Sequence, residues 1–163
     1  MNKVEVEINS DQIIELFNSL DSKKQTTVYK RTMKKASAIL VNQTRKNIRN
    51  VLPNSKKKNK WGMSFEDGVK SNIWRDGSTA KVNIMRHYML KWFEKGTQER
   101  HTGNRILKRK PHPTGRIKAN WFFKKAKEQT EKRIFQEIDS ELAKNIVKVW
   151  GKANKPAMRS IFQ

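Results

Sequence analysis

One segment of the chain, from Ser22 to Phe65, carries thirteen Lys and Arg residues and no acidic residue. Its first part has the period of an amphipathic helix, so we predict a helix from about Lys23 to about Asn50, ended by Pro53. On a helical wheel one side holds Tyr29, Met33, Ala36, Leu40, Thr44 and Val51. The opposite side is basic, with Lys24, Arg31, Lys34, Lys35, Arg45 and Arg49. We therefore expect the basic side to face outward.

A helix whose charges are segregated in this way lacks the pairs of opposite charge that normally stabilise a surface helix. The whole chain shares the bias, with 37 Lys and Arg against 15 Asp and Glu and a formal net charge of +22. This favours a polyanionic partner, most simply nucleic acid, although a basic proteome or an acidic protein neighbour would leave the same signature. The candidate contacts are Lys24, Arg31, Lys35, Arg45, Arg49, Lys56, Lys57, Lys58, Lys108, Arg109 and Lys110.

Shorter patterns precede the long helix. Residues 4–8 alternate between apolar and charged side chains, which predicts a short strand. Ser10 is then suited to cap a helix that runs to Leu20. Ser22, followed by Gln25 three residues later, fits a capping box at the start of the long helix.

Beyond the long helix the pattern changes to short elements. A basic loop covers residues 54–60, and alternation around Asp76-Gly77 predicts a β-hairpin over 69–84. Residues 87–95 are typical of a short helix ended by Gly96. Residues 97–118 form a long basic stretch without a period, which we predict to be a loop ordered only in an assembly, like the C-terminal tail.

The last predicted element is a helix from about Asn120 to Trp150, ended by Gly151. Its apolar residues recur every four positions, so the apolar stripe winds around the helix, which either bends or meets the core at one end and a different partner at the other. We expect the rings at 121–123 to anchor this helix to the core rather than to stack on bases. The predicted fold is α+β: a short antiparallel sheet with a β-hairpin packed against a long basic helix and a long C-terminal helix. We expect one domain over 1–150 and a tail over 151–163.

Motifs of catalysis and metal binding are scarce. The chain has no Cys, which excludes disulfides and Cys-ligated zinc. His101 and His112 lie in the predicted loop, and neither they nor His87 has a ligand partner at helical spacing; the first two only faintly resemble an HNH nuclease. Asp67 near Lys70 lacks the second acid that would hold Mg²⁺. We expect no catalytic activity and no cofactor or metal.

The sequence also bears on location. The first ten residues lack the apolar core of a secretory signal, and no stretch approaches the roughly 18–20 apolar residues of a membrane span. We expect synthesis in the cytoplasm and no membrane partner.

A family resemblance rests on residues 92–100, Trp-Phe-Glu-Lys-Gly-Thr-Gln-Glu-Arg. The core Glu94-Lys95-Gly96-Thr97 resembles the E-[aromatic]-G-T motif of the HK97 gp10-like family of tailed-phage neck and tail-completion proteins, with Lys95 in place of the aromatic residue. The order of elements over about residues 3–148 is also similar. It includes the phrase Gly-Arg-Ile-Lys-Ala-Asn-Trp-Phe-Phe-Lys-Lys-Ala, at 115–126, that leads into the last helix.

The resemblance implies a structural role without a cofactor or a reaction. Such proteins close into rings at the head–tail junction or at the end of the tail tube. The implied partners are copies of the chain in a ring, with six-fold symmetry favoured over twelve-fold, other neck, portal or tail-tube proteins, and genomic DNA passing nearby without sequence specificity. The implied location is the virion neck or tail, after synthesis in the cytoplasm of the host bacterium.

The implied motif residues are Glu94, Gly96, Thr97 and Arg100. Gly96 is suited to the left-handed conformation that ends the short helix, and Thr97 to the start of an exposed loop. Glu94 either pairs with a basic residue, in this chain or in a neighbouring subunit, or is an ordinary surface acid.

Two other classes of function stay open. A free, sequence-nonspecific nucleic-acid-binding protein would be a monomer or dimer whose DNA affinity falls steeply with salt. A nuclease is more remote. If the ring interpretation holds, the basic side of the long helix faces DNA or an acidic neighbour. Reversing the charges of Lys35, Arg45 and Arg49 should then leave the fold intact, because all three face solvent on the wheel.

Overall fold

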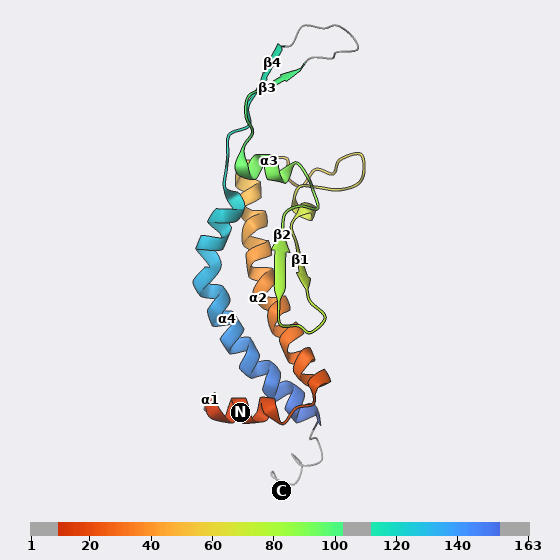
Figure 1. Ribbon diagram of the computed structural model, residues 1–163, viewed down its shortest axis with the longest axis vertical. Helices are drawn as coiled ribbons and strands as arrows, with labels where there is room; N and C mark the ends of the chain where they lie inside the picture. The colour runs from red at the N-terminus through yellow and green to blue at the C-terminus, as the bar shows by residue number, and fades with distance from the viewer. Residues whose placement is uncertain (1–9, 103–111, 154–163) are drawn as a thin grey trace, which may run out of the picture. The chain divides into compact units, whose positions relative to one another are not determined.

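The computed structural model describes residues 10–102 and 112–153. Its elements, coloured along the chain in Figure 1, confirm the predicted α+β class. They are α1 (Ser10–Asn18), α2 (Ser22–Val51), the 3-10 turn η1 (Glu66–Gly68), β1 (Lys70–Ile73), β2 (Ala80–Asn83), α3 (Leu90–Lys95), β3 (Arg100–Thr102), β4 (His112–Gly115) and α4 (Phe122–Ala153). The strand predicted at 4–8 lies outside the described residues.

The chain forms two compact units, and neither is continuous in sequence. Unit 1 comprises residues up to Ser37, 72–81 and from Lys132 onward, whereas unit 2 comprises 38–71 and 82–131. The two long helices, α2 and α4, each contribute one part to each unit. The single domain expected over 1–150 stays a prediction.

Unit 1 has its own apolar core. Leu20, Val28, Ile146 and Val149 are buried, and apolar residues of α1 and α4 pack around them. Within this unit the Asn145 amide donates a hydrogen bond of 3.2 Å to the buried Thr32 hydroxyl. A hydrogen bond between buried groups penalises any slip of one helix along the other, because a slip would leave both groups unpaired. The pair therefore fixes the register of α2 and α4 in unit 1.

The start of α2 differs from the prediction. Asp21, rather than Ser22, caps the helix, because its carboxylate accepts the Lys24 N–H at 2.9 Å. The Gln25 side chain does not close a capping box; it donates to the Phe17 carbonyl at 3.2 Å instead. Asp is as good a cap as Ser, and here the residue one position earlier takes the role.

The β-hairpin predicted over 69–84 is confirmed as β1 and β2. The Asp76 carboxylate accepts the Ser78 N–H and hydroxyl, and Gly77 at the tip has φ 80°. A Cβ at Gly77 would lie 2.8 Å from the Lys30 backbone nitrogen of α2. The tip of the hairpin therefore packs directly against the long basic helix, as the sequence predicted.

Unit 2 has the larger core. Its buried residues are Val41, Ile48, Val69, Ile84, Leu90 and Phe122, and Phe65 packs edge-on against Phe93 at 5.6 Å. Beside this core the Asn47 amide donates to the Phe122 carbonyl and to the Gln129 side chain, both at 3.1 Å. These bonds join α2 to the first turns of α4 within the unit.

The last helix confirms one prediction in part and corrects another. Phe122 is fully buried and Phe123 packs beside it, so these two rings anchor the helix as expected, whereas Trp121 is 44% exposed and does not. The winding apolar stripe also has a structural reason, because Phe122 and Ala126 are buried in unit 2 whereas Ile146 and Val149 are buried in unit 1. Gly151, however, does not end α4, which continues to Ala153. Gly is tolerated near a helix end, so it does not fix the boundary.

The basic loop after α2 is fastened back onto that helix. Glu66 receives two hydrogen bonds of 2.8 Å from the Arg49 guanidinium, and its carboxylate also accepts the Ser55 hydroxyl at 3.3 Å. Arg45 donates to the Glu66 and Val69 carbonyls, both at 3.1 Å. An Arg that binds a carboxylate through two parallel bonds fixes geometry as well as charge. These contacts hold the loop between α2 and β1 in one place.

We predict that the stability contributed by the hydrogen bonds between Glu66 and Arg49 depends on pH. The Arg49 hydrogen bonds hold the pKa of the Glu66 carboxyl below its ordinary value of 4.5. A carboxyl with a lowered folded-state pKa stabilises the fold fully above its unfolded pKa and loses that effect as the pH falls through the folded value. Glu66→Gln should therefore lower the urea midpoint at pH 7 and flatten the loss of stability below about pH 4.5. The exposed Glu131→Gln is the control, and an unchanged slope for Glu66→Gln would contradict the account.

Candidate functional site

The family-like motif forms a joint between α3 and the start of α4 (Figure 1). Glu94 is buried, and its two carboxylate oxygens accept the Phe123 N–H at 2.9 Å and the Lys124 N–H at 3.1 Å. The first N–H groups of a helix have no partner inside the helix, and the positive end of its dipole lies there. Glu94 therefore caps α4 although it stands 29 residues before Phe123 in the chain.

This role differs from those expected for Glu94. Among the described residues no basic side chain forms an ion pair with it, and it is not a surface acid. Its charge is balanced by backbone N–H groups instead.

Gly96 is required at the end of α3 for two reasons. Its backbone has φ 76° and ψ −179°, a region that essentially only glycine occupies. A Cβ at this position would also lie 2.9 Å from both the Ala119 nitrogen and the Ile117 carbonyl oxygen. The helix ends at Gly96 with a positive φ, as expected, but its ψ places it outside the left-handed helical conformation that was predicted. The close approach of residues 117–119 is a further constraint that the motif alone did not reveal.

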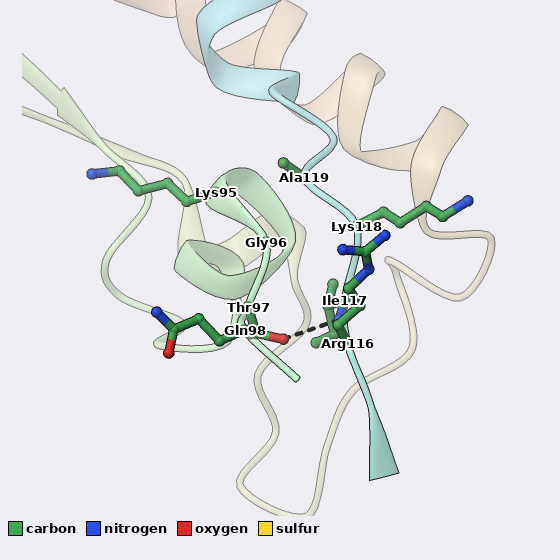
Figure 2. A pocket seen from close by; sticks show the side chains of 8 residues that line it. All are labelled: Lys95, Gly96, Thr97, Gln98, Arg116, Ile117, Lys118 and Ala119. Atoms are coloured by element: carbon green, nitrogen blue, oxygen red, sulfur yellow. Dashed lines mark hydrogen bonds between the residues drawn. The ribbon is translucent and has the colours of Figure 1, made fainter. Parts of the chain in front are cut away.

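Thr97 closes the joint on the other side of Gly96. Its N–H donates to the Ile117 carbonyl, and its hydroxyl accepts the Ile117 N–H, both at 3.0 Å (Figure 2). Asn120 adds a bond from its N–H to the Phe93 carbonyl at 3.0 Å. Thr97 is half-buried and paired, and the exposed Gln98 and Glu99 that follow it agree with its predicted place at the start of the exposed stretch. We call residues 93–97 with 117–124 the α3–α4 joint.

The stretch 97–118 is also more regular than predicted. β3 and β4 pair in antiparallel fashion with Arg100 opposite Gly115, and the Thr114 hydroxyl donates to the Arg100 carbonyl at 2.9 Å. Figure 1 shows this ribbon leading away from α3. Short strands without apolar alternation give little sequence signal, which explains the error. Arg100 thus belongs to β3 rather than to the joint, and residues 103–111 lie outside the described part.

An open hollow of about 520 Å³ lies beside the joint, lined by residues 95–98 and 116–119. Figure 2 shows the Lys95 and Lys118 side chains extending away from each other rather than into it. A small-molecule site needs polar groups that converge on a ligand. The two lysines therefore do not converge on a ligand in the hollow.

Apart from Arg45, the candidate polyanion contacts fall into three groups. Lys24, Lys35 and Arg49 are paired with acids, at 2.7 Å to Asp21, 2.6 Å to Glu141 and 2.8 Å to Glu66. Arg31, Lys56, Lys57 and Lys58 are exposed and form no ion pair within the described residues. Lys108, Arg109 and Lys110 lie outside them.

The expectation that Lys35, Arg45 and Arg49 all face solvent is wrong for Arg45. Its guanidinium is half-buried on the carbonyls of Glu66 and Val69. A helical wheel shows only the helix, so the loop that folds back over this side was invisible to it. Reversing Arg45 would break the fastening of the loop, and the triple charge reversal is therefore not a clean test of the basic surface.

His87 and Asp67 make contacts within the fold. His87 is buried with its ring 4.5 Å from that of Phe65, and burial lowers its pKa. The Asp67 carboxylate accepts the Ser64 N–H and hydroxyl, and these bonds lower the pKa of Asp67. Within residues 10–102 and 112–153 no three His, Asp or Glu side chains gather as metal ligands would.

Sequence reasoning missed the exposed aromatic residues. Tyr88 and Trp92 are 56% and 40% exposed, and their rings meet edge-on at 5.4 Å around the start of α3. Their spacing of four was a visible signal, because such pairs share one side of a helix. Trp61, 68% exposed, follows directly after a run of lysines. Aromatic residues exposed in this way are candidates for partner contacts.

No family model matches the chain, and neither a curated protein nor a solved structure does. Among the described helices none combines the length and the apolar character that crossing a membrane demands.

We predict that Gly96→Ala disrupts the joint more than a matched change at Gly115. Both glycines have φ near 75°, but a Cβ at Gly115 meets nothing within 4 Å. Gly115→Ala should therefore cost only the strain of the backbone, about 1–2 kcal/mol. Gly96→Ala adds overlap with two backbone atoms. It should lower the free energy of unfolding, measured in urea, by at least about 2 kcal/mol more than the control does. Equal losses for the two variants would show that residues 117–119 do not press on Gly96.

Proposed function

We propose that this protein is a structural subunit of a tailed-phage particle, a ring-forming neck or tail-completion protein at the head–tail junction. One observation carries the proposal. Two sequence segments carry the family resemblance, residues 92–100 and 115–126. They contact each other through Glu94, Gly96 and Thr97. This contact supports the view that the two segments act as one structural motif.

The residue types in that joint are physically constrained. Only glycine fits the backbone at position 96, and the Glu94 carboxylate accepts hydrogen bonds from two N–H groups at once. The two departures from the family pattern are compatible with the same geometry. Lys95 is exposed, and Asn120 donates both its N–H and its side-chain amide to the Phe93 carbonyl, at 3.0 and 3.1 Å. A rigid joint suits a subunit that must hold one shape in a closed assembly.

An exposed aromatic pair supplies a candidate contact with a second copy. Tyr88 lies two residues before α3 and Trp92 lies in its first turn, directly before the joint. Tyr and Trp are the residue types that most often dominate the binding energy of protein interfaces. In a ring the same patch on each subunit meets a different patch on the next one. We assign this pair to the contact between neighbouring subunits, with six subunits favoured over twelve.

The unpaired basic residues fit the expected neighbours of such a ring. Arg31 and Lys56–Lys58 are exposed, so they can meet phosphates of passing DNA or acids of an adjoining neck, portal or tail-tube protein. Contacts with phosphates carry no sequence information, as a passage for a whole genome requires.

The second candidate function is a free, sequence-nonspecific nucleic-acid-binding protein. The ordered loop with Lys56, Lys57 and Lys58 favours it, because four contacts with Glu66 hold these charges in a fixed place. The two functions differ in self-association, which the mass of the purified chain measures directly.

We predict a mass of six or twelve times 19.2 kDa in native mass spectrometry, alone or after addition of purified particle components. The double variant Tyr88→Ala with Trp92→Ala should fall to the monomer mass, because it removes the aromatic anchors of the contact. Trp74→Ala, at a Trp that is 61% exposed in the other unit, is the matched control and should keep the ring. A monomer under both conditions would contradict the ring and leave the nucleic-acid-binding function.

A further inference from the structure

The loop over residues 54–63 is exposed yet firmly held. At its first end Ser55 is 1% exposed, its N–H binds the Leu52 carbonyl at 2.9 Å and its hydroxyl binds Glu66. At its second end the Asn59 side chain accepts the Trp61 N–H at 2.9 Å and the Met63 N–H at 3.1 Å. The Asn59 N–H also donates to the Met63 carbonyl. The backbone of this loop is therefore ordered before any partner arrives.

What the loop presents is one indole and four ammonium groups. Lys56, Lys57, Lys58 and Lys60 are all exposed, and the Trp61 side chain is 68% exposed. The Lys60 ammonium lies 4.5 Å from the centre of the Trp61 ring. An ammonium over the ring is an attractive pair that helps to hold the indole in a defined position.

The nearby acids offset only part of these charges. Glu66 is bound by Arg49 and also attracts Lys56, and Asp67, which accepts the Ser64 N–H and hydroxyl, attracts Lys58. None of the four lysines forms an ion pair within the described residues, and the sequence supplies no other acid between Asp21 and Glu66. The loop thus keeps a net positive charge beside an exposed indole.

We propose that loop 54–63 is a binding site for single-stranded nucleic acid, in which Trp61 stacks on a base and the four lysines bind the flanking phosphates. Proteins that hold single strands combine these two groups, aromatic rings for the bases and basic residues for the backbone. A closed duplex offers phosphates, but its bases are already stacked on each other. The exposed indole therefore favours a single strand over a duplex.

A single strand also fits better than an acidic protein partner. Trp is frequent at protein interfaces, but there it is usually central in a desolvated apolar pocket. Trp61 instead has lysines on its N-terminal side and Gly62 on its other side, with nothing within 4 Å of the Gly62 Cβ position. The surroundings are charged and open, which suits a strand that lies across the loop. The inference does not depend on a ring and goes beyond the proposed function.

The test measures the affinity of the full chain for a twelve-nucleotide oligo-dT and for a twelve-base-pair duplex, by fluorescence anisotropy at one fixed salt concentration. Trp61→Ala should weaken oligo-dT binding about 5- to 150-fold, the range for loss of one base–aromatic stack. It should leave duplex affinity within about two-fold. Trp61→Phe should restore part of the oligo-dT affinity, because a smaller ring still stacks.

Two controls separate the site from general charge. Trp74→Ala removes another exposed Trp and should leave oligo-dT affinity unchanged. Replacing Lys56, Lys57 and Lys58 by Gln should lower the slope of log affinity against log salt for oligo-dT by about 2, at roughly 0.7 per phosphate contact. The matched triple change of the exposed Lys127, Lys132 and Lys148 to Gln should lower it by less than half as much.

Three results would overturn the proposal. They are no binding of oligo-dT at low salt, an unchanged oligo-dT affinity in Trp61→Ala, and an equal loss of duplex and oligo-dT affinity in that variant. A lack of binding together with capture of an acidic peptide would assign the loop to a protein partner instead.

Because Trp61 is exposed, its variants should keep the wild-type circular dichroism spectrum and melting temperature. If Trp61→Ala does not fold, Trp61→Leu, which keeps bulk without an aromatic ring, decides in its place. The mass measurement tests the ring independently, so failure of one proposal leaves the other standing.

Discussion

The structure of unit 2 depends on one carboxylate, that of Glu94, and on the two backbone N–H groups that it binds. Those groups belong to Phe123 and Lys124, at the first turn of a helix 32 residues long. When the helix begins at this point, Phe122 falls into the core beside Ile48 and Leu90. The same contact brings residues 117–119 against Gly96, where no side chain fits. The cap, the core and the joint thus depend on one another.

Acidic residues are few in this chain, and several of them hold its parts together. Glu94 caps α4, Glu66 fastens the loop after α2, and the buried Glu141 pairs with Lys35. Each of these acids is occupied within its own unit, and the lysines of loop 54–63 form no ion pair within the described residues, although Glu66 and Asp67 offset part of their charge. This division explains how a chain with a net charge of +22 builds ordered units and still presents an excess of exposed positive charge. The exposed charge is where we place its partners.

Local patterns were readable from the sequence, whereas distant contacts were not. The hairpin around Asp76-Gly77, the two long helices and the positive φ of Gly96 follow from turn chemistry and periodicity. The caps were harder, because the Glu94 cap joins residues 29 apart and Asp21 stands one position before the expected cap. Arg45 was misjudged because a wheel omits the loop that covers it. Within the site, the sequence revealed the motif but not its role in joining α3 to the start of α4.

The central claim is that Glu94 is a buried helix cap rather than a surface acid that awaits a partner. Amide hydrogen exchange of the Phe123 and Lys124 N–H groups, followed by NMR, tests it directly. In Glu94→Ala both amides should exchange about 10- to 150-fold faster, the loss of a hydrogen bond to a charged group, while amides in the middle of α4 change less. Glu99→Ala, an exposed acid five residues further on, should change neither. Wild-type exchange at both amides in Glu94→Ala would contradict the account.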